Sequence, residues 1–87
     1  MIEVLIVSSE EVLFKGQAER ISFPGECGTF EVLPYHRPLV SRLLPGEILI
    51  DDQPLPLLRG VVTVGQHNML TAIVETPQTR PTAEESP

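Results

Sequence analysis

The most reactive side chains in this sequence belong to Cys27, its single cysteine, and His36, which follows in the same loop-rich stretch. A thiol and an imidazole can act as a nucleophile and its base. Here the carboxylate of Glu26 adjoins the thiol and disfavours the thiolate, and no third group is marked as the one that orients the base. An unreactive surface cysteine is a much commoner reading of this pattern, so we expect no catalytic residue.

His36 and His67 could also bind a metal together with nearby carboxylates. Their spacing matches no recognised ligand motif, and one cysteine is too few for a Cys-based zinc cage or an internal disulfide. The glycines are scattered at turns and strand ends, and none opens a phosphate-binding loop before a helix. We therefore expect no metal and no cofactor.

Composition excludes two further classes of function. The chain of 87 residues has twelve acidic and six basic side chains, a net charge of −6. It lacks a Lys/Arg cluster that could neutralise phosphates, so we expect no nucleic-acid binding. No apolar run approaches the roughly 20 residues of a membrane helix, and the start lacks the features of a secretory signal. We expect a cytoplasmic protein, or one attached peripherally to a membrane without insertion.

The elements that position these residues read as short strands. Runs of Val, Ile and Leu are separated by turn residues and often alternate with period two, as where Ile21 and Phe23 share one face. Residues 2–7 are a nearly continuous apolar run, which is typical of a strand covered on both faces. Pro-Gly pairs at 24–25 and 45–46 favour type II turns. The polar residues at 51–53 and at 65–68 favour turns between strands. Pro54 and Pro56 predict an edge strand or a loop, because proline has no backbone N–H to donate. This pattern indicates an all-β sandwich or barrel.

The composition changes after Glu75. Residues 76–87 contain three prolines and almost nothing apolar. Such a segment cannot bury enough surface to offset its ordering entropy. We expect one domain, residues 1–75, followed by a flexible tail rich in Pro, Thr and Glu, residues 76–87.

The stretch 24–40 is dense in proline and glycine yet keeps paired apolar residues. Pro34 and Pro38 flank His36 and restrict the backbone, so that the loop presents this side chain at a small entropic cost. A stiff loop with a polar tip favours docking to another protein, although a connecting loop without function is the alternative. A partner selected by charge is expected to be basic where it touches this acidic chain.

This stretch resembles the amino-terminal domain of ATP synthase epsilon subunits, called delta in mitochondria. That family has Pro-Gly, then Gly-x-apolar, then apolar-Pro-Gly-His-Ala-Pro-Leu-apolar, and a later Pro-Gly before a strand. This chain has Pro-Gly at 24–25, GTF at 28–30, VLPYHRPLV at 32–40 and PGEI at 45–48, in the same order. Tyr35 and Arg37 stand where Gly and Ala are usual, and Glu31 and Arg59 also replace glycines. The resemblance covers residues 2–75.

The resemblance implies a two-sheet antiparallel β-sandwich of about ten short strands, acting as a non-catalytic rotor subunit of the central stalk. It implies that the domain links the gamma subunit to the c-ring and couples proton translocation to ATP synthesis at the cytoplasmic face of a bacterial inner membrane. Candidate residues on the c-ring side are Glu26, Cys27, Gly28, Thr29, Glu31 and His36. Candidates on the gamma side are Pro38, Leu39, Val40, Ser41, Arg42 and Leu43.

The family also has a carboxy-terminal helical hairpin, which in longer members can block ATP hydrolysis and in some binds ATP. Residues 76–87 are too few and too rich in proline for two packed helices. We therefore expect no inhibitory switch and no nucleotide binding. The alternative from another class is a free-standing β-sandwich adaptor that binds other proteins.

Overall fold

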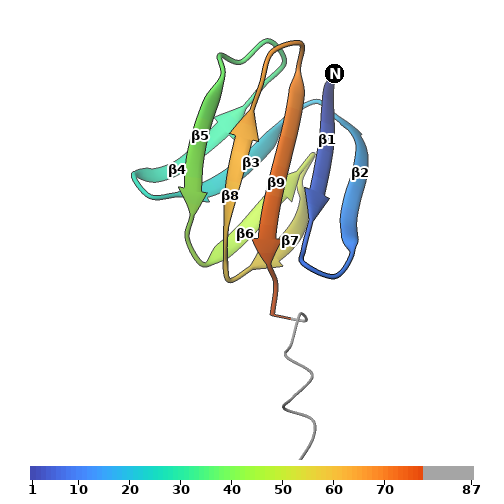
Figure 1. Ribbon diagram of the computed structural model, residues 1–87. Helices are drawn as coiled ribbons and strands as arrows, with labels where there is room; N and C mark the ends of the chain where they lie inside the picture. Colours follow the sequence, from blue (N-terminus) through green and yellow to red (C-terminus); the bar gives the residue numbers. More distant parts are fainter. Residues whose placement is uncertain (78–87) are drawn as a thin grey trace, which may run out of the picture.

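The computed structural model describes residues 1–77, which form nine β-strands and no helix (Figure 1). The strands are β1 (Ile2–Val7), β2 (Val12–Ala18), β3 (Ile21–Gly25), β4 (Gly28–Val32), β5 (Leu39–Leu43), β6 (Gly46–Ile50), β7 (Gln53–Leu57), β8 (Arg59–Val64) and β9 (Met69–Glu75). The prediction of an all-β domain is confirmed. Of the predicted tail, Thr76 is buried beyond the end of β9, and residues 78–87 lie outside the described residues.

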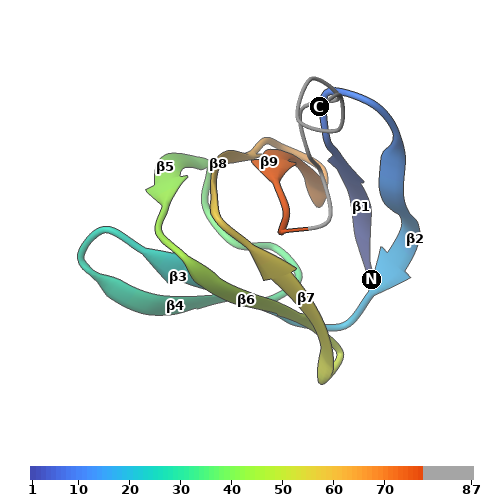
Figure 2. The ribbon, with the colours of Figure 1, turned by 90° about the horizontal axis from the view of Figure 1, so that it is seen from below.

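The strands form one hydrogen-bonded sheet that folds over into two layers. The order along the sheet is β2-β1-β9-β8-β5-β3-β6-β7, and β4 pairs with β3. β5 and β3 share a single residue pair, Gly25 opposite Leu43, so the sheet can turn sharply there. Seen from below, β3, β4, β6 and β7 make one layer, and β5, β8, β9, β1 and β2 curl over it (Figure 2). The predicted two-sheet sandwich is confirmed in this form.

One strand pair departs from the antiparallel prediction. β1 lies parallel to β9, with Val4 opposite Leu70 and Ile6 opposite Ala72. The other strand pairs of the described region are antiparallel. Strands joined by short turns must run antiparallel, whereas β1 and β9 are the first and last strands and no short turn joins them. The intervening strands supply the long connection that a parallel pair requires.

The core lies between the layers and receives alternate residues from the strands. Ile21 and Phe23, which period two predicts on one face, are both buried. The same period continues along the other strands, where the buried residues include Val32, Ile48, Ile50, Val62, Val64, Leu70, Ala72 and Val74. Burying a side chain of this size contributes about 1.5–3 kcal/mol relative to leaving it exposed. Phe23 also stacks on Phe30 across the β3–β4 pair, with ring centroids 5.5 Å apart. This packing fixes which face of every strand points outward.

The predicted type II turn at Pro24-Gly25 is wrong. Both residues belong to β3, and the chain turns one step later, at Glu26 and Cys27. Gly25 is required for packing, since a Cβ there would lie 2.7 Å from an atom of the Phe30 ring. The positive φ of 120° falls on Gly28, the residue after the turn. Gly25 pairs with Gly28, so two residues connect β3 to β4, a position that Pro-Gly spacing alone does not reveal.

Pro54 and Pro56 lie on β7, at the end of the strand order, as the edge-strand prediction requires. They pair with Leu49 and Glu47 across a tight two-residue hairpin. Counting from that hairpin, both prolines occupy positions whose nitrogen points away from β6, so the ladder loses no hydrogen bond. The free edge of β7 thereby lacks two donors, which disfavours pairing with another strand.

A polar clasp joins the link between β2 and β3 to the turn between β6 and β7. Oδ1 of Asp51 accepts hydrogen bonds from the backbone N–H of Glu19, at 2.9 Å, and of Arg20, at 3.0 Å. The Asp51 N–H donates to the Arg20 carbonyl oxygen at 3.0 Å. Asp52 pairs with the Arg20 guanidinium at 2.8 Å, and this hydrogen bond and charge raise the pKa of Arg20 above its ordinary value. The clasp closes one end of the sandwich.

We predict that Asp51→Ala lowers the free energy of unfolding by about 1–2 kcal/mol, because two backbone donors lose their acceptor. Asp51 has a φ of 49°, a left-handed value that Asn tolerates and Ala does not. Asp51→Asn keeps an acceptor and this backbone preference, so it should lose less than half as much. Urea unfolding followed by circular dichroism measures both. Equal losses in the two variants would show that the clasp depends on charge and not on the hydrogen bonds.

Candidate docking surfaces

The six residues predicted for the c-ring side lie along one edge of the molecule. Glu26 and Cys27 form the turn before β4, Thr29 and Glu31 lie on β4, and His36 lies in the connection that follows it (Figure 1). Within the described sheet β4 pairs only with β3. Pro24 pairs with Thr29 and cannot donate, so the register turns the backbone groups of Thr29 toward the free edge. The fold thus gathers these candidates along an open strand edge, called here the β4 edge.

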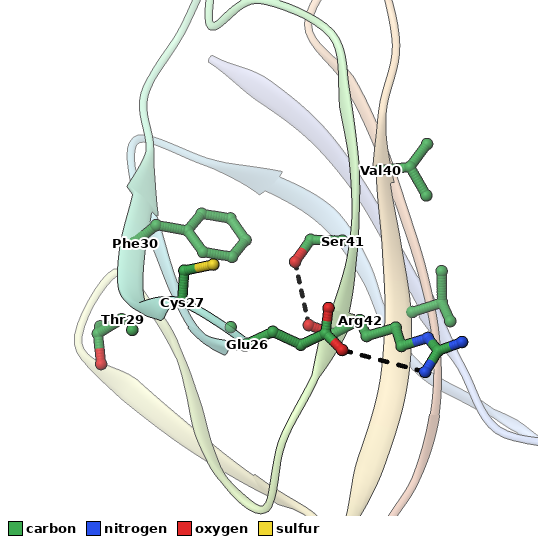
Figure 3. Close-up of a pocket in the computed structure, with 10 residues that line it drawn as sticks. Glu26, Cys27, Thr29, Phe30, Val40, Ser41 and Arg42 are labelled. Carbon is green, nitrogen blue, oxygen red and sulfur yellow. Dashed lines mark hydrogen bonds and ion pairs between the residues drawn. The ribbon is translucent and has the colours of Figure 1, made fainter.

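The two predicted groups of residues meet at the tip of the β3–β4 hairpin. An open hollow of about 580 Å³ separates this tip from β5 and is lined by residues 25–30, by Val40, Ser41 and Arg42, and by Val61. The Glu26 carboxylate reaches across it to the Arg42 guanidinium at 4.0 Å (Figure 3). The Ser41 hydroxyl donates to the Arg42 carbonyl oxygen at 3.0 Å. The contact between Glu26 and Arg42 depends on the folding over of the sheet at the pair Gly25–Leu43. No local sequence pattern predicts it.

The remaining c-ring candidates have different surroundings. Glu31 is exposed and lies 3.8 Å from the Arg20 guanidinium. His36 is half-buried, and its Nδ1 lies 2.7 Å from the Arg37 carbonyl oxygen. Cys27 is exposed at one end of β4 and His36 follows the other end, and a strand of this length spans roughly 17 Å. The thiol and the imidazole therefore do not form the nucleophile and base considered above.

Only half of the predicted gamma-side segment faces outward. On β5, Leu43 is buried and Leu39 packs against the core, while Val40 and Arg42 are exposed. Ser41, opposite the buried Val62, points inward. This alternation follows from period two, so a partner that covers β5 contacts Val40 and Arg42.

Sequence reasoning missed the residues that continue this surface across the sheet. Arg42 pairs with Val61, Val61 with Ile73, and Ile73 with Val7. Val40 is 72% exposed, Ile73 60% and Val61 42%. We call this surface the β5–β8–β9–β1 face. The signal was present as apolar residues at both odd and even positions of β1, β8 and β9, which marks strands covered on two sides.

The described part of the chain brings together no group of His, Cys, Asp and Glu that could hold a metal ion. It has no helix long and apolar enough to cross a membrane. What residues 1–77 do present is an acidic open strand edge and a partly apolar sheet face. The class defined by the fold is therefore a β-sandwich domain, and the edge and the face are its candidate contact surfaces.

The comparisons with known proteins place this domain in a family. Residues 1–76 match the family described as the ATP synthase delta/epsilon chain, beta-sandwich domain, and the chain belongs to it. The ATP synthase epsilon chain of Bordetella petrii is 35% identical over 80 residues, and that of Herminiimonas arsenicoxydans is 35% identical over 79. The matches cover 86% and 84% of this chain but 56% of each relative. The chain thus spans little more than half the length of these relatives.

Two solved structures have the same fold at low sequence identity. One is a chain of the Tetrahymena thermophila mitochondrial ATP synthase central stalk and c-ring, with a TM-score of 0.72, 16% identity, and coverage of 85% of this chain and 63% of that one. The other comes from the Euglena gracilis mitochondrial ATP synthase, with a TM-score of 0.77, 18% identity, and coverage of 84% and 49%. These likenesses establish the β-sandwich independently of the family match.

We predict that the Glu26–Arg42 pair contributes almost nothing to stability, because both side chains are more than half exposed and stand 4.0 Å apart. A double-mutant cycle with Glu26→Gln and Arg42→Gln should give a coupling energy below about 0.3 kcal/mol. The matched control is Arg59–Glu75, which is similarly exposed but hydrogen-bonded at 2.9 Å across β8 and β9. That pair should couple by about 0.2–1 kcal/mol. A stronger coupling at Glu26–Arg42 would mean that Glu26 is engaged within the molecule.

Proposed function

We propose that this chain is a non-catalytic central-stalk subunit of an F-type ATP synthase, which links the gamma subunit to the c-ring. Family membership supports the assembly, and the presence of two different exposed surfaces, which adjoin at Glu26 and Arg42, supports the linking role. In this proposal the β5–β8–β9–β1 face binds gamma, and the β4 edge faces the c-ring. The rigid sandwich between the two surfaces would carry torque and so couple proton flow to ATP synthesis.

The assignment of the β5–β8–β9–β1 face to gamma is supported by its exposed apolar side chains. Val40, Val61 and Ile73 project from three adjacent strands, and the half-buried Leu5 and Val7 continue the surface onto β1. Contiguous apolar patches of this kind mark protein contact surfaces. Arg42 at one border supplies a charge that can fix orientation. Pro38 and Leu39 enter the strand from the connecting loop, so they would lie at the margin of the contact.

The assignment of the β4 edge to the c-ring is supported by its acidic side chains and by backbone groups that no neighbouring strand pairs with in the described sheet. Glu26 and Glu31 project from the hairpin and from β4, each opposite one exposed arginine of its own chain. Such exposed pairs are weak and can exchange for a basic partner. Cys27, Gly28 and Thr29 are exposed between them. We infer that basic polar loops of the c-ring meet this edge at the cytoplasmic face of a bacterial inner membrane.

We further propose that these 87 residues neither bind nucleotide nor inhibit ATP hydrolysis. The support is the sequence after the domain, where three prolines interrupt residues 76–87. Coupling requires only the sandwich and its two surfaces. ATP added to the labelled chain should cause no saturable shift of its amide resonances.

The experiment that tests the assignment is co-purification of the tagged chain with gamma and with a gamma–c-ring complex from the same source. Retention of gamma by the tagged chain, and of the ring when gamma is present, supports a stalk subunit. Retention of neither would contradict the proposal and favour a free-standing β-sandwich adaptor. The chain is used whole, so both surfaces are present.

We predict that Ile73→Glu weakens binding to gamma by about tenfold or more, because it places a charge at the centre of the β5–β8–β9–β1 face. The matched control is Leu49→Glu. Leu49 is an exposed apolar strand residue on β6, in the opposite layer. Both changes alter an outward position, so both variants should keep the wild-type melting temperature within a few degrees. Equal affinities for gamma in the two variants would contradict the assignment of this face to gamma.

A further inference from the structure

Tyr35 adopts a backbone conformation that its side chain disfavours. The His36 N–H donates to the Leu33 carbonyl oxygen at 3.1 Å, which closes a four-residue turn. Pro34 is the second residue of this turn and Tyr35 the third, with a φ of 67°. A positive φ after a proline is the geometry of a type II turn, whose third position normally holds glycine. A bulky residue there is strained.

The strain is imposed by the surroundings of the turn. The Tyr35 N–H donates to Oδ1 of Asn68, in the hairpin between β8 and β9. The Asn68 carbonyl oxygen in turn accepts from the Glu3 N–H of β1 at 2.7 Å. One asparagine thus fastens the loop to two other segments at the same end of the sandwich. Strained residues that are held in this way concentrate at functional sites.

The ring of Tyr35 does not serve the fold. It is 88% exposed, more than any other large apolar side chain in the described region, and it is the single tyrosine of the chain. A side chain this exposed buries too little area within its own domain to offset the backbone strain. Glycine would relieve that strain and cost the core nothing. The stabilising contact of this ring must therefore lie outside the isolated domain.

We propose that Tyr35 is an aromatic anchor that inserts between the polar loops of the c-ring. This inference rests on the proposed function, because the turn directly follows β4, whose edge is assigned to the ring. A phenol suits such a contact, since its ring buries apolar area while its hydroxyl bonds to polar loop groups. The proline-stiffened turn, held by Asn68, presents the ring with little entropy left to lose on binding.

The test compares the wild-type chain with Tyr35→Gly, Tyr35→Asn and Tyr35→Phe, each bound to gamma alone and to the gamma–c-ring complex. Gly relieves the strain, Asn tolerates the positive φ without adding flexibility, and Phe keeps the ring. Affinity for the complex should fall by about tenfold or more with Gly and Asn and change little with Phe. Affinity for gamma alone should be unchanged in all of them. The melting temperature of the Gly variant should stay level or rise by a few degrees.

Three results would overturn the inference. If wild type and Tyr35→Gly bind the complex equally, Tyr35 is not an anchor, although the proposed function stands. If the melting temperature falls together with the affinity, Tyr35 supports the loop and not the partner. If the wild-type chain binds the gamma–c-ring complex no more tightly than it binds gamma alone, the assignment of the β4 edge to the ring is wrong, and this inference is wrong with it.

Discussion

The architecture depends on a single sheet covering its own apolar face. Nine strands from residues 2–75 form one hydrogen-bonded sheet, and the two halves of that sheet are joined by the pair Gly25–Leu43. A one-pair connection lets the sheet fold over, so Phe23 and Ile48 on one half share one core with Val62 and Leu70 on the other. The same fold-over sets the β3–β4 hairpin beside β5, which brings the two candidate docking surfaces to neighbouring sides of the domain.

Period two and turn chemistry were sufficient to predict the class of fold, the inward residues and the edge position of the strand with Pro54 and Pro56. They mispredicted the turn at Pro24-Gly25, because the glycine there is needed for packing and not for a turn. Gly25 sits in a strand because Phe30 leaves no room for a Cβ, and the turn moves on to Glu26. The parallel pair of β1 and β9 was also missed, since strands far apart in sequence leave no local record of their pairing.

The candidate surfaces were predictable only in part, for a related reason. Family motifs located the residues of the β4 edge and of β5, but they could not show that Glu26 faces Arg42 or that Val40 points outward while Ser41 points inward. No sequence motif marks Ile73 as part of the surface. It joins the surface through the register of β5, β8 and β9, which is a property of the assembled sheet. Most of the candidate contact surface therefore depends on strand pairing, and little of it on local sequence.

The proposed contact between the β4 edge and the c-ring can be tested directly at Cys27, which lies at the tip of that edge. The thiol is exposed and is the only one in the chain, so maleimide labelling read from the mass of this chain is unambiguous. Labelling should be as fast in the complex with gamma as in the free chain, and it should slow sharply when the c-ring is added. An unchanged rate in the complete complex, with the ring shown to be bound, would contradict the claim that this edge faces the ring.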